Sequence, residues 1–123
     1  MHYPLSASPT IGAAAGAQAD GSRYLRYADV EMDLAAYKVR RGGQVVPLAP
    51  VKFRLLQLML SRPGEVFSRE ALRSRLWGEE ARIDLRTVDA HVVRLRMALN
   101  AGGRPDLIRT VRTIGYALDV ETV

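Results

Sequence analysis

A chain of 123 residues has room for a single domain with a modest hydrophobic core, and its composition, 48% hydrophobic and 25% charged, is ordinary for a globular protein. The sequence contains no cysteine, which excludes disulfides and thiolate chemistry, and no apolar run of about 18 residues that could span a membrane. The net charge of +5 favours a polyanionic partner such as a nucleic acid.

The first 22 residues, MHYPLSASPTIGAAAGAQADGS, are dominated by small residues, glycine and proline, and show no sustained hydrophobic period. Such a composition predicts a flexible leader or linker before a domain that occupies residues 23–123. No basic segment precedes an apolar stretch here, which argues against a secretory signal. Together with the lack of cysteine, this indicates a cytoplasmic protein.

Three short antiparallel strands are predicted after this leader. The segment YLRYADVEMDL, residues 24–34, alternates loosely between apolar and polar side chains, and YKVRR and QVVPL flank Gly42-Gly43. A glycine pair supplies the positive φ angles that a tight turn requires, so the second and third strands should form a hairpin.

Two helices should follow the strands. In APVKFRLLQLMLSRPG, residues 49–64, apolar side chains recur at helical spacing, Pro50 suits the first helical position and Pro63-Gly64 ends the helix. A second helix is expected to begin after Ser68, a favourable N-cap, and to end at Gly78.

A third helix is predicted for DLRTVDAHVVRLRMAL, residues 84–99, after the polar connection EEARID. Its apolar residues lie within about 60° of one another on a helix, which predicts one core-facing stripe made of Val88, Val92, Leu95 and Leu99. The segment LIRTVRTIGYALDV, residues 107–120, then predicts a β-hairpin with RTIG at its tip, where Gly115 is expected to take a positive φ.

The third helix also carries an acid and a histidine, which raises the question of catalysis. Asp89 and His91 are two residues apart, so their side chains should point about 200° apart on a helix and cannot form an acid–base dyad. His2 is the only other histidine, so a transition-metal site lacks ligands, and neither a glycine-rich phosphate loop nor a nucleophile motif is present. We therefore expect no enzyme, no metal and no cofactor.

The face opposite the apolar stripe suits the major groove of DNA. Arg94 can make a bidentate contact with guanine, and Ala90 or Val93 can pack on a thymine methyl group. Arg86, Thr87 and Arg96 are placed to reach phosphates on either side. The alternative is a solvated helix whose basic face is incidental.

The neighbouring elements favour DNA binding over that alternative. Two successive helices with a short connection form a helix-turn-helix arrangement, and a β-hairpin directly after the second of them forms a wing. Arg112, near the tip of the hairpin, could enter the minor groove, whose negative potential attracts arginine. Arg109 could do the same or brace the sheet.

The segments RTVDAHVVRLRMAL and LIRTVRTIGY resemble the effector domain of the OmpR/PhoB class of bacterial response regulators, and LQLMLSRPGEVFSREALRSRLWG fits the first two helices of that family. The resemblance covers about residues 25–120. It implies an α+β fold, a winged helix-turn-helix with an N-terminal antiparallel sheet, three helices and a C-terminal β-hairpin wing. The family's sheet has four strands, so Leu48 or its neighbours are expected to form the fourth.

The positions that match the family's motifs imply roles for individual residues of this chain. The resemblance implies base reading by Arg94, Val93 and Ala90 and minor-groove contacts from the wing by Thr110 and Arg112. Contacts with the phosphate backbone are implied for Trp77, Arg86, Thr87, His91, Arg96 and Tyr116. Trp77 and Tyr116 could equally be core aromatics. The loop after the second helix would contact RNA polymerase and its sigma factor through Glu79, Glu80, Arg82 and Asp84, unless it is merely a solvated connector.

The resemblance implies a regulator that binds direct repeats of duplex DNA as a head-to-tail pair, as the output domain of a two-component system. The closest likeness within the family is to its phosphate-regulon members. Val93 and Met97 stand where the family usually has basic residues, so nonspecific affinity should be weaker than in a typical member. These two residues also favour the alternative function, a protein-interaction module that docks on RNA polymerase without reading DNA.

Overall fold

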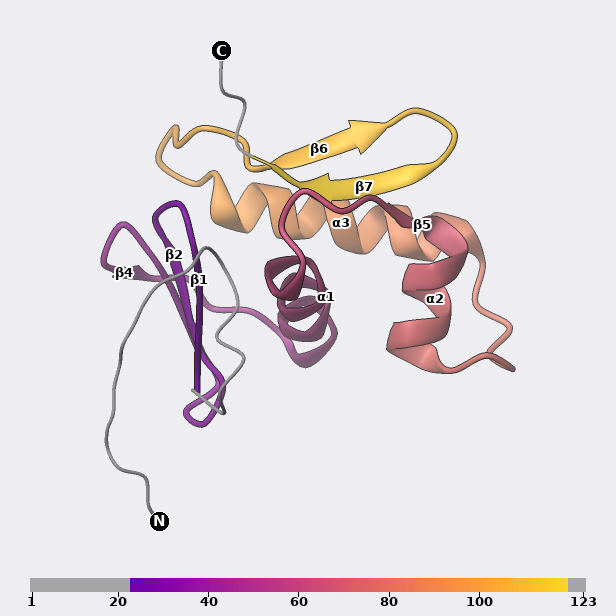
Figure 1. Cartoon of the computed structure of the whole chain (residues 1–123), viewed down its shortest axis with the longest axis horizontal. Helices are drawn as coiled ribbons and strands as arrows, with labels where there is room; N and C mark the ends of the chain where they lie inside the picture. The colour runs from indigo at the N-terminus through magenta and orange to yellow at the C-terminus, as the bar shows by residue number, and fades with distance from the viewer. Residues whose placement is uncertain (1–22, 120–123) are drawn as a thin grey trace.

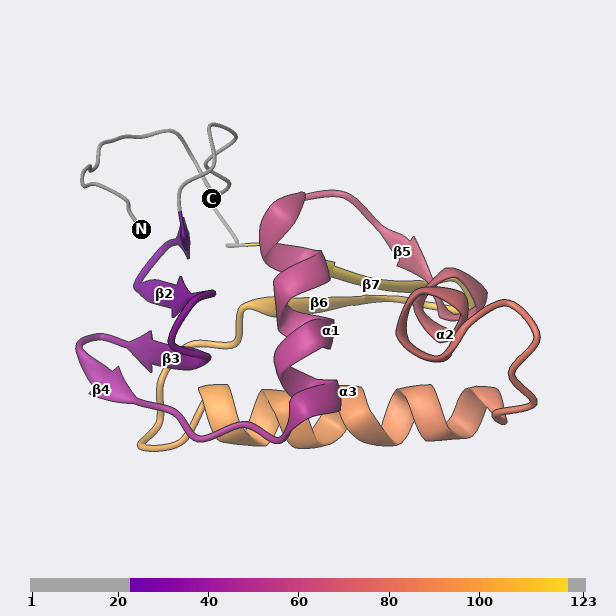
Figure 2. The same cartoon turned by 90° about the horizontal axis from the view of Figure 1, so that it is seen from below.

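The computed structural model describes residues 23–119; the predicted leader, residues 1–22, lies outside the described residues. Three helices and two antiparallel sheets make up this part of the chain (Figure 1). The first sheet lies at one end of α3, and the second sheet runs along the length of α3 (Figure 2). None of the helices within residues 23–119 has the length and hydrophobicity needed to cross a membrane.

The N-terminal sheet has four strands in the order β1-β2-β3-β4, with bounds Tyr24–Tyr27, Val30–Asp33, Lys38–Arg41 and Gln44–Val45. The sequence predicts three strands, and the fourth arises because the first predicted stretch reverses direction at Ala28, which has a φ of 54°. The expectation that Leu48 or its neighbours form the fourth strand is wrong: Leu48 lies in no strand. The predicted turn at Gly42-Gly43 is confirmed, with φ angles of 58° and 85°.

A buried arginine fixes this sheet to the end of the third helix. The inner face of the sheet buries Val30, Met32 and Val39, but the next inward position holds Arg41, which is 1% exposed. Its guanidinium donates hydrogen bonds to the carbonyl oxygens of Leu99 (2.8 Å) and Pro105 (2.7 Å) and to Oδ1 of Asp29 (3.0 Å). A cation at a helix C-terminus also interacts favourably with the helix dipole. The position of the sheet is thereby tied to α3.

The helices form close to where the sequence predicts them. Helix α1 spans Pro50–Ser61 and α2 spans Arg69–Trp77; the hydroxyl of Ser68 caps α2 by accepting a hydrogen bond from the amide of Ala71 (3.0 Å). Helix α3 spans Leu85–Leu99, and the carboxylate of Asp84 caps it. The predicted stripe on α3 is confirmed, because each of its four residues is at most 1% exposed (Val88, Val92, Leu95 and Leu99).

The second sheet has the strand order β5-β7-β6, with bounds Phe67–Ser68, Gly115–Leu118 and Ile108–Val111. The sequence does not predict strand β5. Gly115 does not take the expected positive φ; Thr113 in the turn does, at 64°. Glycine is required at 115 for another reason: a Cβ there would lie 1.8 Å from the carbonyl oxygen of Phe67 on β5. Strands β6 and β7 form the hairpin that the sequence predicts as the wing. The pairing of β7 with β5, which directly precedes α2, joins the wing to the start of that helix.

Candidate nucleic-acid interface

One face of α3 is left uncovered by the rest of the domain. It carries the exposed side chains of Arg86, Val93, Arg94 and Met97, and Ala90 is half-buried beside them. The side chain of Arg86 is 89% exposed, and its nearest carboxylate, Asp84, lies at 3.9 Å. The guanidinium of Arg94 forms no hydrogen bond or ion pair with any residue in the range 23–119. Two guanidinium groups on this face are thus available to a partner.

The acid next to this face is neutralised from within the domain. Asp89 points toward the wing, where its carboxylate accepts two hydrogen bonds from Arg69 (3.1 and 2.9 Å) and one from the hydroxyl of Tyr116 (2.7 Å). The hydrogen bond from Arg69 is the main cause that holds the pKa of Asp89 below its usual range, and burial opposes it. Because Arg69 starts α2 and Tyr116 lies on β7, this cluster locks α3 to both of its neighbours.

The same cluster changes the acidity of Tyr116. Burial, followed by its hydrogen bond to the Asp89 carboxylate, raises the pKa of Tyr116 to about 12. Tyr116 is 8% exposed and belongs to the hydrophobic core, while its hydroxyl binds the half-buried Asp89 on α3.

A second contact between α3 and the wing uses Arg96. Its Nη2 donates to the carbonyl oxygen of Ile108 (2.6 Å) and to the hydroxyl of Thr110 (2.7 Å), both on β6. Its Nε lies 3.4 Å from Oδ2 of Asp106. Two residues predicted to contact DNA, Arg96 and Thr110, therefore contact each other, and in this arrangement they brace the helix against the hairpin.

His91 and Asp89 have different partners: Asp89 is bound by Arg69 and Tyr116, and His91 contacts the preceding turn of α3 and Trp77. Its Nδ1–H donates to the carbonyl oxygen of Thr87 (2.9 Å), since a carbonyl can only accept. The imidazole packs edge-on against the ring of Trp77, with 5.4 Å between ring centroids. Both rings are half-buried at the rim of the uncovered face.

The turn of the wing, residues 112–114, is exposed and carries Arg112, whose guanidinium forms no hydrogen bond or ion pair within residues 23–119. Arg109, by contrast, donates to Oδ2 of Asp119 (2.9 Å) and so braces the hairpin. A shallow cavity of about 170 Å³ lies beside the wing turn and the start of α2, and it is lined by Arg69, Thr110, Val111, Arg112, Thr113, Gly115 and Tyr116.

Arg69 is a site residue that sequence reasoning missed. It reaches the wing only because α2 begins directly after the β5–β7 pairing, where its amide donates to the carbonyl oxygen of Ile114 (3.2 Å). The sequence contains one indication of this role. An arginine at the first position of a helix is unfavourable with respect to the helix dipole, so its presence there suggests that it binds an acidic group elsewhere in the fold.

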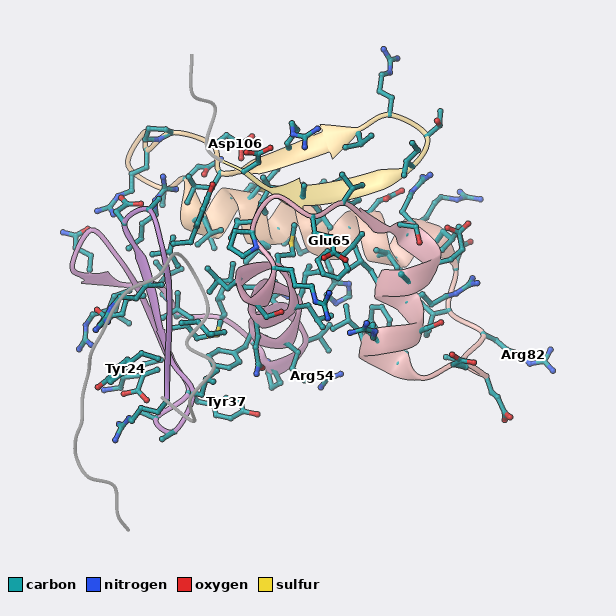
Figure 3. All side chains as sticks on the ribbon, viewed as in Figure 1. Tyr24, Tyr37, Arg54, Glu65, Arg82 and Asp106 are labelled. Carbon is teal, nitrogen blue, oxygen red and sulfur yellow. The ribbon has the colours of Figure 1, made fainter. Side chains whose placement is uncertain are left out.

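The loop between α2 and α3, residues 78–84, lies at the far end of the molecule from the four-stranded sheet, and Arg82 points outward from it (Figure 3). Glu79, Glu80 and Arg82 are exposed. Asp84 is also exposed but accepts a hydrogen bond from the amide of Arg86 (2.9 Å) at the start of α3. A hydrogen bond from Arg73 to the carbonyl oxygen of Ile83 (3.2 Å) ties this loop to α2.

A helix-turn-helix whose second helix presents an uncovered basic face beside a β-hairpin defines a winged-helix nucleic-acid-binding domain. Residues 43–118 match the family described as "Transcriptional regulatory protein, C terminal", and the chain belongs to this family. It is thus a DNA-binding transcription-regulator domain of the OmpR/PhoB type. This family consists of transcription regulators and not of enzymes, which agrees with the prediction from the sequence that the chain is not an enzyme. Within residues 23–119, no cluster of side chains suited to a metal ion occurs.

The relatives of this chain are longer regulators. It is 49% identical over 98 residues to the phosphate regulon transcriptional regulatory protein PhoB of Rhizobium meliloti, covering 80% of this chain and 43% of PhoB. It is 41% identical over 105 residues to the transcriptional activator protein IrlR of Burkholderia pseudomallei, covering 85% of this chain and 46% of IrlR. The chain thus spans less than half the length of these relatives.

A solved structure shows the same fold. The RstA DNA-binding domain of Klebsiella pneumoniae, crystallised in complex with the RstA box, is 29% identical, with a TM-score of 0.69. The match covers 79% of this chain and 97% of that one. The predicted winged-helix fold is therefore confirmed.

Proposed function

We propose that this domain reads duplex DNA by placing α3 in the major groove and the wing turn in the adjacent minor groove. The observation that carries the proposal is the uncovered face of α3, where Arg86 and Arg94 are exposed and the nearby acid, Asp89, is already neutralised. The exposed Arg112 on the wing turn supplies the minor-groove contact. The complex of the RstA domain with its box supports the same use of the fold.

In this arrangement the site residues divide into two groups. Arg94 reads guanine, and Ala90 and Val93 pack against bases. Arg86, Thr87, Trp77 and His91 contact phosphates; His91 donates to a phosphate from Nε2–H as an imidazolium, because Nδ1–H already donates to Thr87. Arg96, Thr110 and Tyr116 already use polar atoms within the domain, so their main contribution is to hold α3 and the wing at a fixed spacing.

The proposed target class is a phosphate-regulon operator, bound by two copies head-to-tail on direct repeats, with the four-stranded sheet of one copy meeting the wing side of the next. The 49% identity to PhoB supports it, and the 41% identity to IrlR shows why it needs a test. The chain would serve as the output domain of a two-component response regulator acting in the cytoplasm.

Fluorescence anisotropy of this chain tests the target across a salt series. One duplex carries tandem repeats of phosphate-box type, and the other is scrambled to the same composition. Tighter, two-step binding to the repeats that survives moderate salt supports the proposed target. Equal binding to both duplexes that vanishes as salt rises would rule out that target, because only phosphate contacts would remain.

The loop between α2 and α3 is the proposed contact with RNA polymerase and its sigma factor. Glu79 and Glu80 are exposed and would repel DNA, but they suit a basic protein surface, with Arg82 and Asp84 at the edge of the contact. The double variant Glu79→Gln/Glu80→Gln should keep DNA affinity and lose transcription activation in a reconstituted assay.

A protein-interaction module that does not read DNA remains the alternative, favoured by the exposed apolar residues Val93 and Met97. The variant Arg94→Ala distinguishes the two functions. If it binds the preferred duplex about fivefold to 100-fold more weakly, α3 reads bases. If DNA binding and promoter activity are unchanged while the Glu79/Glu80 variant is inactive, the interaction module is correct.

A further inference from the structure

Two large apolar side chains stand on the uncovered face of α3. Val93 is 50% exposed and Met97 is 68% exposed, and no other residue of α3 belongs to the exposed large hydrophobic residues of the described chain. They are four positions apart, so they project from the same side of the helix on consecutive turns. Neither contributes to the core, which leaves their hydrophobic surface without a role in folding.

We propose that Val93 and Met97 bind the C5-methyl groups of two thymines in the major groove, and so select the sequence that the domain recognises. The thymine methyl is the one apolar group that the four ordinary base pairs present in that groove, and the other major-groove groups are hydrogen-bond donors or acceptors. Valine has no polar atom and the thioether of methionine is only a weak acceptor, so both prefer the methyl group. This inference rests on the DNA-reading function proposed above.

The charges around the two residues favour DNA over a protein as the occupant. Arg86 and Arg94 lie on the same face. Asp89 faces the wing and is held there by Arg69 and Tyr116. A face that combines exposed guanidinium groups with apolar side chains, and whose neighbouring carboxylate Asp89 is already bound, complements a groove that has anionic walls and apolar methyl groups on its floor.

The helix geometry sets the spacing of the two thymines. Four residues advance an α-helix by about 6 Å, and base pairs stack about 3.4 Å apart, so the methyl groups should lie about two base pairs apart.

The experiment uses the duplex most enriched when the 123-residue chain selects from a randomised pool. Each thymine is replaced in turn by deoxyuridine, which removes the methyl group and changes nothing else on the base. Binding by the unchanged chain should weaken about threefold to fivefold at each of two positions. Val93→Ala should lose the sensitivity at one position and Met97→Ala at the other. Val66→Ala, a control at a residue that is 36% exposed and lies outside α3, the four-stranded sheet and the wing turn, should keep both.

The outcomes separate this inference from the function on which it rests. If no deoxyuridine position weakens binding, or if both variants keep the full sensitivity, Val93 and Met97 do not read methyl groups. If Arg94→Ala still weakens binding in that case, the DNA-reading function stands alone. If selection enriches no sequence at all, the proposed function fails together with the inference, and a protein partner becomes the occupant of this face.

Discussion

Tyr116→Phe tests whether the cluster that joins α3 to the wing stabilises the domain. The substitution keeps the buried ring and removes only the hydroxyl, which donates to the Asp89 carboxylate at 2.7 Å. A hydrogen bond to a charged group contributes about 1.5–3 kcal/mol. Asp89 keeps both bonds from Arg69, so it is not left unsatisfied, and we expect a loss near the lower end, about 1.5 kcal/mol.

The pKa of Tyr116 gives the same prediction a pH dependence. The pKa is raised to about 12, and it is about 10 in the unfolded chain. Because the pKa is higher in the folded state, the protonated hydroxyl of Tyr116 contributes its full stabilisation to the folded domain below about pH 10. This contribution is lost as the pH rises toward 12, because the unfolded chain releases the proton more readily. Phenylalanine does not titrate, so the difference in stability between the two proteins should narrow above about pH 10.

Urea unfolding followed by circular dichroism measures both effects, at about pH 7 and at intervals from about pH 9 to 11.5. Tyr37→Phe is a suitable control, because Tyr37, labelled in Figure 3, is 63% exposed and its ring, which the substitution keeps, stacks on that of Phe53 with 4.4 Å between centroids. The reasoning is refuted if Tyr116→Phe is as stable as the unchanged chain at neutral pH, or if the difference between them does not change with pH.

Further substitutions test other parts of the structure. Asp89→Asn should lower the free energy of unfolding at neutral pH, and because the folded pKa of Asp89 is lowered, this loss should shrink as the pH falls below about 4; a constant loss would contradict the ionic role. Gly115→Ala should disrupt the pairing of β5 with β7, because its Cβ would overlap the carbonyl of Phe67, and thermal unfolding should show a clearly lower Tm. Arg41→Met should cost at least about 2 kcal/mol in urea unfolding, since two backbone carbonyls lose their donor. Arg86→Ala should weaken binding to all duplexes alike and reduce the salt slope by about 0.9, whereas a sequence-dependent effect would assign Arg86 to base reading.

The sequence predicts the elements whose signals are local. The stripe on α3 follows from a period of about 3.6 residues, and the starts of α1 and α2 follow from Pro50 and Ser68, whose effects act within a single turn. The uncovered face of α3 follows from the same period, since residues opposite a buried stripe must be exposed. For the same reason the helical period by itself places Asp89 and His91 on different sides of the helix.

The sequence does not predict strands of two residues or contacts between distant residues. Strand β5 consists of Phe67–Ser68, too short for a period, and it exists because Gly115 admits a close approach of β7. The reversal at Ala28 uses a non-glycine residue with positive φ, which carries no common sequence signal.

For this protein, then, local periodicity and capping determined which segments are helices and which face of α3 is free to meet a partner. Tertiary structure alone decided which of the charged residues remain available on that face. Arg96 and Arg94 are two positions apart on one helix, yet the guanidinium of Arg96 is bound to β6 and that of Arg94 has no partner within residues 23–119. The physical reason is that the electrostatic environment of a side chain depends on groups within a few ångströms of it. Folding brings such groups together from distant positions in the chain, as it brings Tyr116 to Asp89, and local sequence patterns do not predict these contacts.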